Sequence, residues 1–381
     1  MNRHKEFNQW YKRKPTDTRR AHAYIPESAK GTYLIMSGNK RFDHTHMKRL
    51  IEKHGMREVD VARGQKESVQ FVWVDVNDNG IFDKRSYGIH CQVKNLLDDK
   101  KGCITDKESL HYLLQERFPK ESAKYLPHTY NVRGLDPDTM DWSDGKVYIM
   151  RPVGKGKFCG KGIVRVSNPE EFRAAQAEMI KEPTDHAIAS EYVTNPFLID
   201  GRKSHIRMYW MVRGATETLP AACSLCPVGI FCTAKKPYVN DNLEDREIHD
   251  SHNKTTDKCV FWPRDMPERM PAEAIPLAHA QAEEIMRCVG EIYTKEAKPF
   301  SEAKYGFEVF GVDFLMDDKY NMHLIEINDR IGFGKAMNDP DPENRFGTFT
   351  EEFFQWVYEK AIGPMLGFEP DPFSKDLAPQ K

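Results

Sequence analysis

The sequence lacks the features that would place the chain in a membrane or outside the cell. No apolar run reaches the roughly 20 residues of a membrane-spanning helix, and the first residues carry no apolar core of a secretory signal. The 8 cysteines are scattered over 381 residues, without the dense spacing of a disulfide framework. We therefore expect a cytoplasmic protein in a reducing compartment.

Charge of one sign is also lacking. The 56 Lys and Arg nearly balance the 58 Asp and Glu, and the net charge of −2 gives no global field that selects nucleic acid or a membrane. The first twenty residues are the exception, because they are rich in Lys and Arg: MNRHKEFNQWYKRKPTDTRR. This segment predicts either a frayed tail or a basic arm for an acidic partner.

The length predicts two or three lobes, because a single core rarely extends over a chain of 381 residues. A hydrophobic fraction of 39% and a charged fraction of 30% are typical of a globular protein. The order of strand-like and helix-like runs indicates an α/β fold. We expect a basic arm, a small N-terminal α/β lobe, a central lobe, a C-terminal lobe and a tail, at residues 1–30, 31–104, 105–190, 191–372 and 373–381.

The sequence predicts five helices: residues 348–366 form the last, and the others lie at 42–55, 105–119, 168–180 and 276–293. In the second, Thr105 and Glu108 have the spacing of a capping box. In the last, a stripe at helical spacing is expected to face the core: Phe349, Phe353, Trp356 and Val357. Trp73, in the strand-like run 69–76, is expected in the core as well.

Residues 307–329, FEVFGVDFLMDDKYNMHLIEIND, predict a β-hairpin that carries acids inside apolar strands. Asp313 and Glu326 are about equally far from the turn, so one register places them opposite each other. Asn328 shares the strand face of Glu326. Three oxygen ligands at one place suit Mg²⁺, which completes its shell with water and phosphate. The alternative is a solvated sheet face that carries acids.

The segment RPVGKGKFCGKGI, residues 151–163, places glycines and lysines between two strand-like runs. Glycines let backbone N–H groups approach a phosphate, and lysines neutralise it. The segment is not a P-loop, which needs a GK[ST] ending, and no helix follows as in a Rossmann fingerprint. It predicts a flap over a nucleotide or, equally, a flexible hairpin tip.

The order of these pieces resembles the tubulin tyrosine ligase-like family of ATP-grasp ligases. The matching pieces are TDKESL, YIMRPVGKGKFCGKGI, EYVTNPFLIDGRKSHIR, FGVDF and LIEIN, between about residues 105 and 330. The resemblance implies an ATP-grasp fold, with a small N-terminal α/β lobe and two lobes that clamp ATP between antiparallel sheets. It also implies ATP and Mg²⁺, and the joining of an amino acid to a protein carboxylate through an acyl-phosphate.

The resemblance also assigns roles to single residues. Asp313, Glu326 and Asn328 would hold the metal ion, and Lys203, Arg207 and Glu326 would act in catalysis. Lys203 and Arg207, four apart on one strand, are expected to face the site together. The expected nucleotide-binding residues are Lys107, Arg151, Lys155, Lys157, Gly160, Lys161, Gly162, Ser190, Glu191, Tyr192, Val193, Lys203, His205, Arg207 and Asp313.

The chain departs from the family pattern at four places. Arg151 stands where the family usually has Lys, a change that keeps the charge. The family's KFDIR is KSHIR here, with His205 in place of Asp, and Cys232 aligns with a family Arg. The family's Leu-Thr-Asn segment has its nearest counterpart in IHDSHN, residues 248–253. These departures concern substrate recognition, and we expect His205 and Cys232 at the amino-acid and acceptor end of the cleft, beyond the phosphates.

Two metal patterns are set aside. The DVNDNG segment at 75–80 begins like a calcium loop, but its twelfth position is Ser86 rather than Glu, so a tight turn is the better interpretation. The CSLC segment at 223–226 lacks a second cysteine pair with zinc spacing, and small apolar strand residues account for it better.

Three functional hypotheses follow. The first is a ligase that adds an amino acid, with glutamate as one candidate, to a protein carboxylate such as the acidic tail of tubulin. The second is a pseudoenzyme that binds nucleotide or protein without turnover, suggested by His205 and Cys232. The third is an ATP-grasp ligase for another protein or a peptide. We expect a monomer with a protein acceptor and a free amino acid as partners, without nucleic acid or membrane, in the cytoplasm near microtubules.

Overall fold

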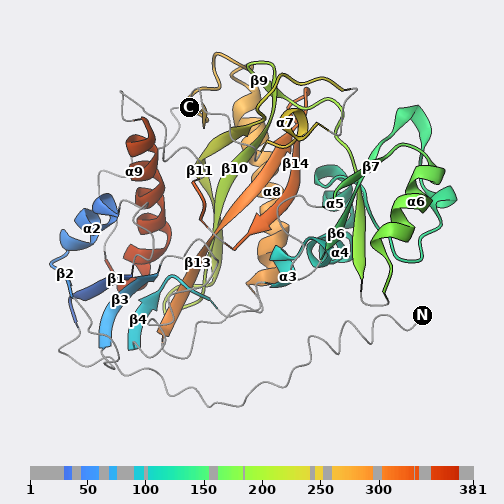
Figure 1. Cartoon of the computed structure of the whole chain (residues 1–381). Helices are drawn as coiled ribbons and strands as arrows, with labels where there is room; N and C mark the ends of the chain where they lie inside the picture. Colours follow the sequence, from blue (N-terminus) through green and yellow to red (C-terminus); the bar gives the residue numbers. More distant parts are fainter. Residues whose placement is uncertain are drawn as a thin grey trace.

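The computed structural model shows two sheets with helices packed on their faces (Figure 1). It describes residues 30–36, 44–59, 68–74, 90–97, 102–153, 162–182, 185–240, 245–251, 260–294, 303–329, 331–333 and 345–368. Several sequence predictions fall outside these ranges: the basic arm up to residue 29, segment 75–80, the tail, and Lys155, Lys157, Gly160 and Lys161. Within the described ranges, every helix is too short or too polar to span a membrane.

The N-terminal part forms a parallel β-structure, as expected from its strand, helix, strand order. Strands β1 (Thr32–Met36), β3 (Ser68–Val74) and β4 (His90–Lys94) run parallel, and the two-residue strand β2 (Arg57–Glu58) pairs with β1 at the sheet edge. Helix α2 (Thr45–Glu52) is shorter than the predicted 42–55. A turn replaces its last residues and ends at Gly55, whose φ of +76° a helix cannot contain.

Strand β13 (Ala303–Met316) joins this parallel part to an antiparallel part within one ten-stranded sheet. Its first residues pair with β4 in parallel, and its later residues pair with β14 (Met322–Asn328) in antiparallel fashion. Its other edge pairs along most of its length with β10 (Arg202–Arg213). The antiparallel part is completed by β9 (Leu198–Ile199), β11 (Ala222–Thr233) and β12 (Val260–Trp262).

The central lobe contains a separate antiparallel sheet of four strands, in the order β5-β8-β6-β7. The strands are β5 (Thr129–Asn131), β6 (Tyr148–Val153), β7 (Val164–Val166) and β8 (His186–Glu191). Helix α6 (Pro169–Met179) packs on it through Phe172 and Ala175, in a small core of its own. Two single turns precede β6, at Pro137–Thr139 and Ser143–Gly145. Figure 1 shows this lobe as a separate green body beside the large sheet.

Helices cover the large sheet and close two cores. Helix α8 (Ala274–Tyr293) agrees with the predicted 276–293 and packs with α3 (Gly102–Thr105), α4 (Lys107–Arg117) and α5 (Pro119–Tyr125). The C-terminal segment is helical as predicted: α9 (Arg345–Val357), a π-helical stretch (Tyr358–Ile362) and α10 (Gly363–Leu366). The Phe349 stripe and Trp73 are buried in one core, which confirms their prediction as core residues.

The helix predicted over 105–119 is divided, and its expected capping box is wrong. Thr105 ends α3, and Asp106 is the N-cap of α4, where its carboxylate accepts a hydrogen bond from the Ser109 backbone N–H at 2.9 Å. Glu108 instead accepts a hydrogen bond from the Asn131 side chain at 2.6 Å, in the central lobe. An Asp competes well with Thr as N-cap, and the sequence offered both. The new helix start places Lys107 in the first turn of α4.

Candidate functional site

The hairpin of β13 and β14 supplies the centre of the site. Asp313 lies directly opposite Glu326, and Gly311 opposite Asn328, so the register predicted from the sequence is confirmed. A bulge follows this pair, because Phe314 pairs with Leu324 and leaves Ile325 as an extra residue. Asp313 is 1% exposed, so its carboxylate is buried among the apolar residues of its strand.

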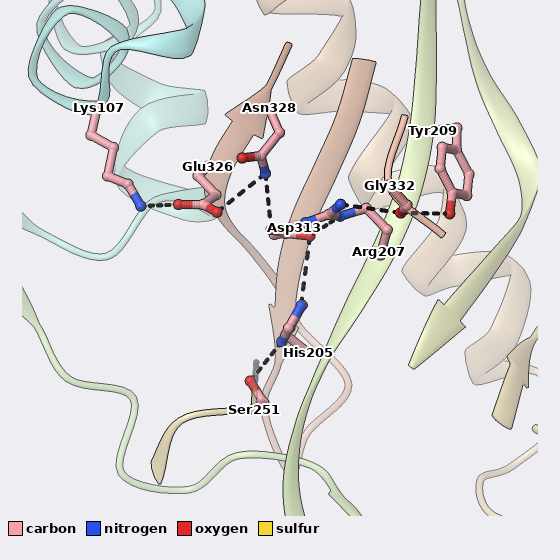
Figure 2. A network of polar contacts seen from close by, with 9 residues as sticks. All are labelled: Lys107, His205, Arg207, Tyr209, Ser251, Asp313, Glu326, Asn328 and Gly332. Atoms are coloured by element: carbon pink, nitrogen blue, oxygen red, sulfur yellow. Dashed lines mark hydrogen bonds and ion pairs between the residues drawn. The ribbon is translucent and has the colours of Figure 1, made fainter. Parts of the chain in front are cut away.

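Positively charged side chains hold the two carboxylates (Figure 2). The Arg207 guanidinium donates from Nε to Oδ1 of Asp313 at 2.5 Å and from Nη2 to Oδ2 at 2.8 Å. This bidentate pair follows from the sheet register, in which Arg207 on β10 is the partner of Asp313 on β13. Burial alone would lower the pKa of Arg207, but the charge of Asp313 and its hydrogen bonds to the guanidinium together outweigh burial, and the pKa is raised.

Lys107 from α4 forms an ion pair with Glu326 on the other side of the cluster. Asn328 lies between the two carboxylates, and its Nδ2 donates to Oδ2 of Asp313 and to Oε1 of Glu326, each at 3.1 Å. A side chain from the helical layer, one from β10 and three from the hairpin thus meet in one polar network inside the protein (Figure 2).

A cavity of about 490 Å³ lies beside this network, between the central sheet and the hairpin. Its polar lining includes five cationic side chains: Lys107, Arg151, Arg165, Lys203 and Arg246. Burial, followed by the charge of Arg151, lowers the pKa of Lys107 to about 7 and that of Lys203 to about 7. Burial also lowers the pKa of Arg151. The charge of Arg151 thus disfavours the charged forms of Lys107 and Lys203. A polyanionic ligand in the same space would relieve this repulsion.

One part of the cavity lining is apolar and suits a flat aromatic group. Ile149 and Ile188 come from the central sheet, and Leu315 and Leu324 from the hairpin. The connecting segment between the lobes lines the same space, including all the residues expected to receive adenine: Ser190, Glu191, Tyr192 and Val193. A nucleotide has both parts, an apolar base and a charged phosphate chain, so the cavity has the chemistry of a nucleotide site.

Comparison with known proteins agrees with this geometry. The model of the Tubulin-tyrosine ligase family matches residues 90–258. The crystal structure of the C-terminal domain from K. lactis Pby1, an ATP-grasp enzyme interacting with the mRNA decapping enzyme Dcp2, superposes with a TM-score of 0.61. The superposition covers 89% of this chain and 95% of that chain, at 18% identity.

The chain is similar to the tubulin tyrosine ligase family over residues 90–258, and its fold is the ATP-grasp fold. The expected α/β ATP-grasp fold is thereby confirmed.

Three curated relatives show how far the family likeness extends. "Probable tubulin--tyrosine ligase PBY1" of Saccharomyces cerevisiae is 29% identical over 163 residues, 38% of this chain and 21% of that protein. "Inactive polyglycylase TTLL10" of Homo sapiens is 24% identical over 228 residues, 49% of this chain and 31% of that protein. "Probable tubulin polyglutamylase TTLL9" of Bos taurus is 22% identical over 356 residues, 78% of this chain and 76% of that protein. The match spans less than a third of the length of the first two.

The tubulin tyrosine ligase-like pattern predicted Lys203 and Arg207 on one side of the site, but the structure separates their surroundings. Lys203 lines the cavity and donates to the Tyr192 hydroxyl at 2.8 Å. Arg207 is absent from the cavity's described lining and contacts Asp313 and the Gly332 carbonyl oxygen, the latter at 3.3 Å. The sheet partner of Arg207 is Asp313, and this buried carboxylate pairs with the guanidinium.

His205 and Cys232 lie together as cross-strand partners on β10 and β11. His205 lines the cavity, and its Nε2 is 3.7 Å from Oδ1 of Asp313, so it is closer to the carboxylate cluster than the sequence led us to expect. Its Nδ1 lies 2.6 Å from the Ser251 hydroxyl. Burial raises the pKa of the Cys232 thiol to about 11, so the thiol is uncharged at pH 7.

The flap is described only at its end, where Gly162 also lines up with the family motif. Gly162 has a φ of +75°, and a Cβ there would lie 3.3 Å from the Pro152 ring, so both the backbone and the space favour glycine. The other flap residues expected to bind phosphate lie outside the described ranges, and their role stays a prediction.

Sequence reasoning located one further segment only approximately. Residues 245–251, which include the short helix α7 (Arg246–His249), place Arg246, His249, Asp250 and Ser251 in the cavity lining. His249 Nδ1 lies 3.0 Å from the Tyr192 hydroxyl, which in turn accepts from Lys203. Only residues 248–253 of this segment were aligned, loosely, with the family, and no periodicity in the sequence marked their place. His111, also in the lining, had no signal beyond its helix.

The CSLC segment has a packing role in the described structure. Cys226 is fully buried, and a Cβ on Gly290 of α8 would lie 2.5 Å from the Cys223 Sγ. Strand β11 and helix α8 therefore approach closely at Cys223 and Gly290, where both elements carry small residues. This fits the interpretation as small strand residues, and within the described residues no cluster of three His, Cys, Asp or Glu could hold a metal ion.

Proposed function

We propose that the chain is an ATP-dependent ligase that joins the amine of an amino acid to a carboxylate of a protein. The observation that supports it most is the pairing of Asp313 with Glu326 across the hairpin, next to a cavity lined by Lys107, Arg151 and Lys203. Phosphoryl transfer needs cations around the phosphates and carboxylates that hold a metal ion, and both lie in one place here.

The proposed reaction has two steps. In the first, an oxygen of the acceptor carboxylate attacks the γ-phosphorus of ATP, the bond to the β-phosphate oxygen breaks, and ADP leaves. In the second, the amine attacks the acyl carbon, phosphate leaves, and the nitrogen loses a proton. Lys107, Arg151 and Lys203 would hold the charge that develops on phosphate oxygens. Lys155, Lys157 and Lys161 would join them from the flap.

The hairpin residues fit a Mg²⁺ ion. Asp313 and Glu326 offer carboxylate oxygens that share one neighbour, the Asn328 amide at 3.1 Å from each. The amide group can turn over and present its oxygen, because its two ends have nearly the same shape. An all-oxygen set with two carboxylates is what Mg²⁺ takes in phosphate chemistry. When held by Asp313, Glu326 and Asn328, the ion would supply positive charge that neutralises part of the charge of the phosphates.

Arg207 would act by holding Asp313. Its fork fixes both carboxylate oxygens and thus the direction in which the remaining lone pairs point. Lys107 would exchange partners, because Glu326 cannot serve both the lysine and a metal ion with the same oxygen. The lysine would then turn to phosphate.

The substrates follow from the family rather than from the cavity. Among the relatives, one is named as a probable tubulin polyglutamylase, and another is named as a probable tubulin–tyrosine ligase. We propose an amino acid such as glutamate as the amine and an acidic protein segment, with tubulin as the first candidate, as the acceptor. A cytoplasmic location near microtubules belongs to the same proposal. A different protein acceptor is the alternative.

The experiment is incubation of the chain with ATP, Mg²⁺, mixed amino acids and tubulin, followed by mass spectrometry of the acceptor. The matched variants are Glu326→Gln, at the site, and Glu283→Gln, on the exposed face of α8. A mass increase of one amino acid that Glu326→Gln abolishes and Glu283→Gln leaves unchanged is the expected result. Transfer that persists undiminished in Glu326→Gln would contradict the assignment.

A nucleotide-binding pseudoenzyme is the second candidate, and one observation favours it. Both carboxylates are already paired with cations, Asp313 with Arg207 and Glu326 with Lys107. One relative is itself named an inactive polyglycylase. Binding of ATP with Mg²⁺ in calorimetry, without transfer to any acceptor or release of phosphate, would decide for this candidate.

A further inference from the structure

Helix α4 carries a buried histidine that the proposed chemistry does not use. His111 is 6% exposed and lines the nucleotide cavity. It also lines a second cavity of about 760 Å³, which shares Glu191, Tyr192 and Val193 of the connecting segment with the first. Lys107 precedes it by one helical turn on the same face of α4. The helix therefore presents two polar side chains in line, with Lys107 at the carboxylate cluster and His111 one turn away from it.

Two polar atoms at this place lack hydrogen-bond partners. Within the described part of the chain, neither Nδ1 of His111 nor Nε of Arg151 has a partner, although both atoms are buried. Buried polar atoms in folded proteins are almost always paired, so each such atom calls for an explanation. His111 and Arg151 both line the nucleotide cavity, where a bound ligand can supply the missing partners.

The ring of His111 is uncharged at neutral pH. Burial, with the charges of Arg151 and Lys107 added, lowers its pKa to about 4. A neutral imidazole carries one donor and one acceptor nitrogen, whereas the Arg151 Nε–H only donates. A neutral ring adds no positive charge to the phosphate site, whereas its donor and acceptor nitrogens match a neutral polar group of the nucleotide.

We propose that His111 contacts the adenosine part of the bound nucleotide through Nδ1; this rests on the nucleotide site proposed above. The group it meets combines a hydrogen-bond donor and an acceptor at close range, which serves the imidazole and the Arg151 Nε–H together. Adenosine has two such groups, a ribose hydroxyl and the edge of the base that carries the amino group. Apolar Ile188 and Pro127 share both cavities with His111 and would pack on the same part of the ligand.

The test is calorimetric titration of the full chain with ATP and ADP, each with Mg²⁺. His111→Leu removes the polar atoms, His111→Asn returns a polar group near Nδ1, and Tyr112→Phe on the exposed neighbour is the matched control. We expect His111→Leu to weaken ATP and ADP by the same factor, roughly three- to tenfold, the value of one neutral hydrogen bond. His111→Asn should regain part of it, and Tyr112→Phe should bind as the wild type.

A second readout separates a ligand contact from a packing role. Without nucleotide, His111→Leu should melt no lower than the wild type, since it removes an unpaired buried atom. Two further ligands identify the group: 2′-deoxy-ATP for the ribose and GTP for the base. The wild type should discriminate against one of them, and His111→Leu should lose that discrimination.

Several outcomes would overturn the inference. Equal nucleotide affinity in His111→Leu and the wild type would do so, as would a larger loss for ATP than for ADP, which marks a phosphate contact. A lower melting temperature with equal losses in His111→Leu and His111→Asn would mark a packing role. A wild type that binds neither ATP nor ADP would refute the proposed function itself, whereas the other outcomes leave it standing.

Discussion

The buried pair of Arg207 and Asp313 gives the most quantitative prediction. Asp313 has 1% of its side chain exposed and Arg207 15%, and the two are joined by hydrogen bonds of 2.5 and 2.8 Å. Arg207→Met keeps most of the side-chain length but leaves the carboxylate buried without its cation. Removing one partner of a buried pair costs about 3–5 kcal/mol. We expect the lower end, about 3 kcal/mol, because the Asn328 amide and His205 remain near Asp313.

The double variant Arg207→Met, Asp313→Asn separates the pair from its surroundings. It has no unpaired charge, so its cost should fall short of the summed single costs by about 2 kcal/mol, the size of a direct interaction. The assay is thermal and urea unfolding of the three variants without nucleotide. Arg287→Met is the control, since the Arg287–Glu291 pair lies on the surface of α8 and should be worth less than about 1 kcal/mol. Additive single costs, or a cost for Arg207→Met no larger than for the control, would refute a desolvated pair.

Four further predictions concern the site and the arm. Glu326→Gln should lose turnover by at least about a hundredfold, as for a lost transition-state contact, with a melting temperature near that of the wild type; near-normal activity would end the metal assignment. Lys203 has its pKa lowered from 10.5 to about 7, so the folded chain binds fewer protons than the unfolded chain between these values, and stability without nucleotide should rise with pH there. Lys203→Met should flatten that rise, and ATP affinity in the wild type should fall above pH 7 as the lysine loses its charge; an unchanged profile in the variant would exclude Lys203 as the source. His205→Asp with Cys232→Arg should change the preferred amino acid in the transfer assay, and because His205 lies 3.7 Å from Asp313, Mg²⁺ dependence is measured beside it; an effect on Mg²⁺ alone would contradict a role in amino-acid choice. Deleting residues 1–20 should raise the KM for an acidic acceptor more at low salt than at high salt, whereas an equal rise at both would point to folding.

The hairpin shows why part of the site could be predicted from the sequence. Strand polarity alternates with a period of two, and the turn fixes where the strands face each other, so the opposition of Asp313 and Glu326 followed from counting. The core stripe of the C-terminal helix followed in the same way from a period of 3.6. Both predictions use contacts that are local in sequence.

The residues that were missed or misplaced come from contacts between distant segments. The Arg207–Asp313 pair depends on the register of β10 against β13, which join residues about a hundred positions apart. His111 lines the cavity on α4, which meets the hairpin at the Lys107–Glu326 ion pair, and residues 245–251 line the same cavity although they are distant in sequence from both. No periodicity in those segments encodes the partner. The capping error at Thr105 was different in kind, because two adjacent residues could serve as N-cap, and packing against Asn131 engaged Glu108 elsewhere.

Strand β13 has a consequence for building hybrid proteins from this family. One edge of this strand pairs first with β4 and then with β14, so Ala303–Gly306 belong to the parallel N-terminal part of the sheet and Gly311–Met316 to the β13–β14 hairpin. The N-terminal lobe is therefore not a module that can be exchanged at residue 104, because its last sheet partner is encoded two hundred residues later. A chimera with a foreign N-terminal lobe must also contain the foreign counterpart of Ala303–Gly306. Without it, the edge of β4 would stay unpaired and open to aggregation. The boundaries of the central lobe are better places to join segments of two proteins. The four-stranded sheet of that lobe shares no strand with the large sheet.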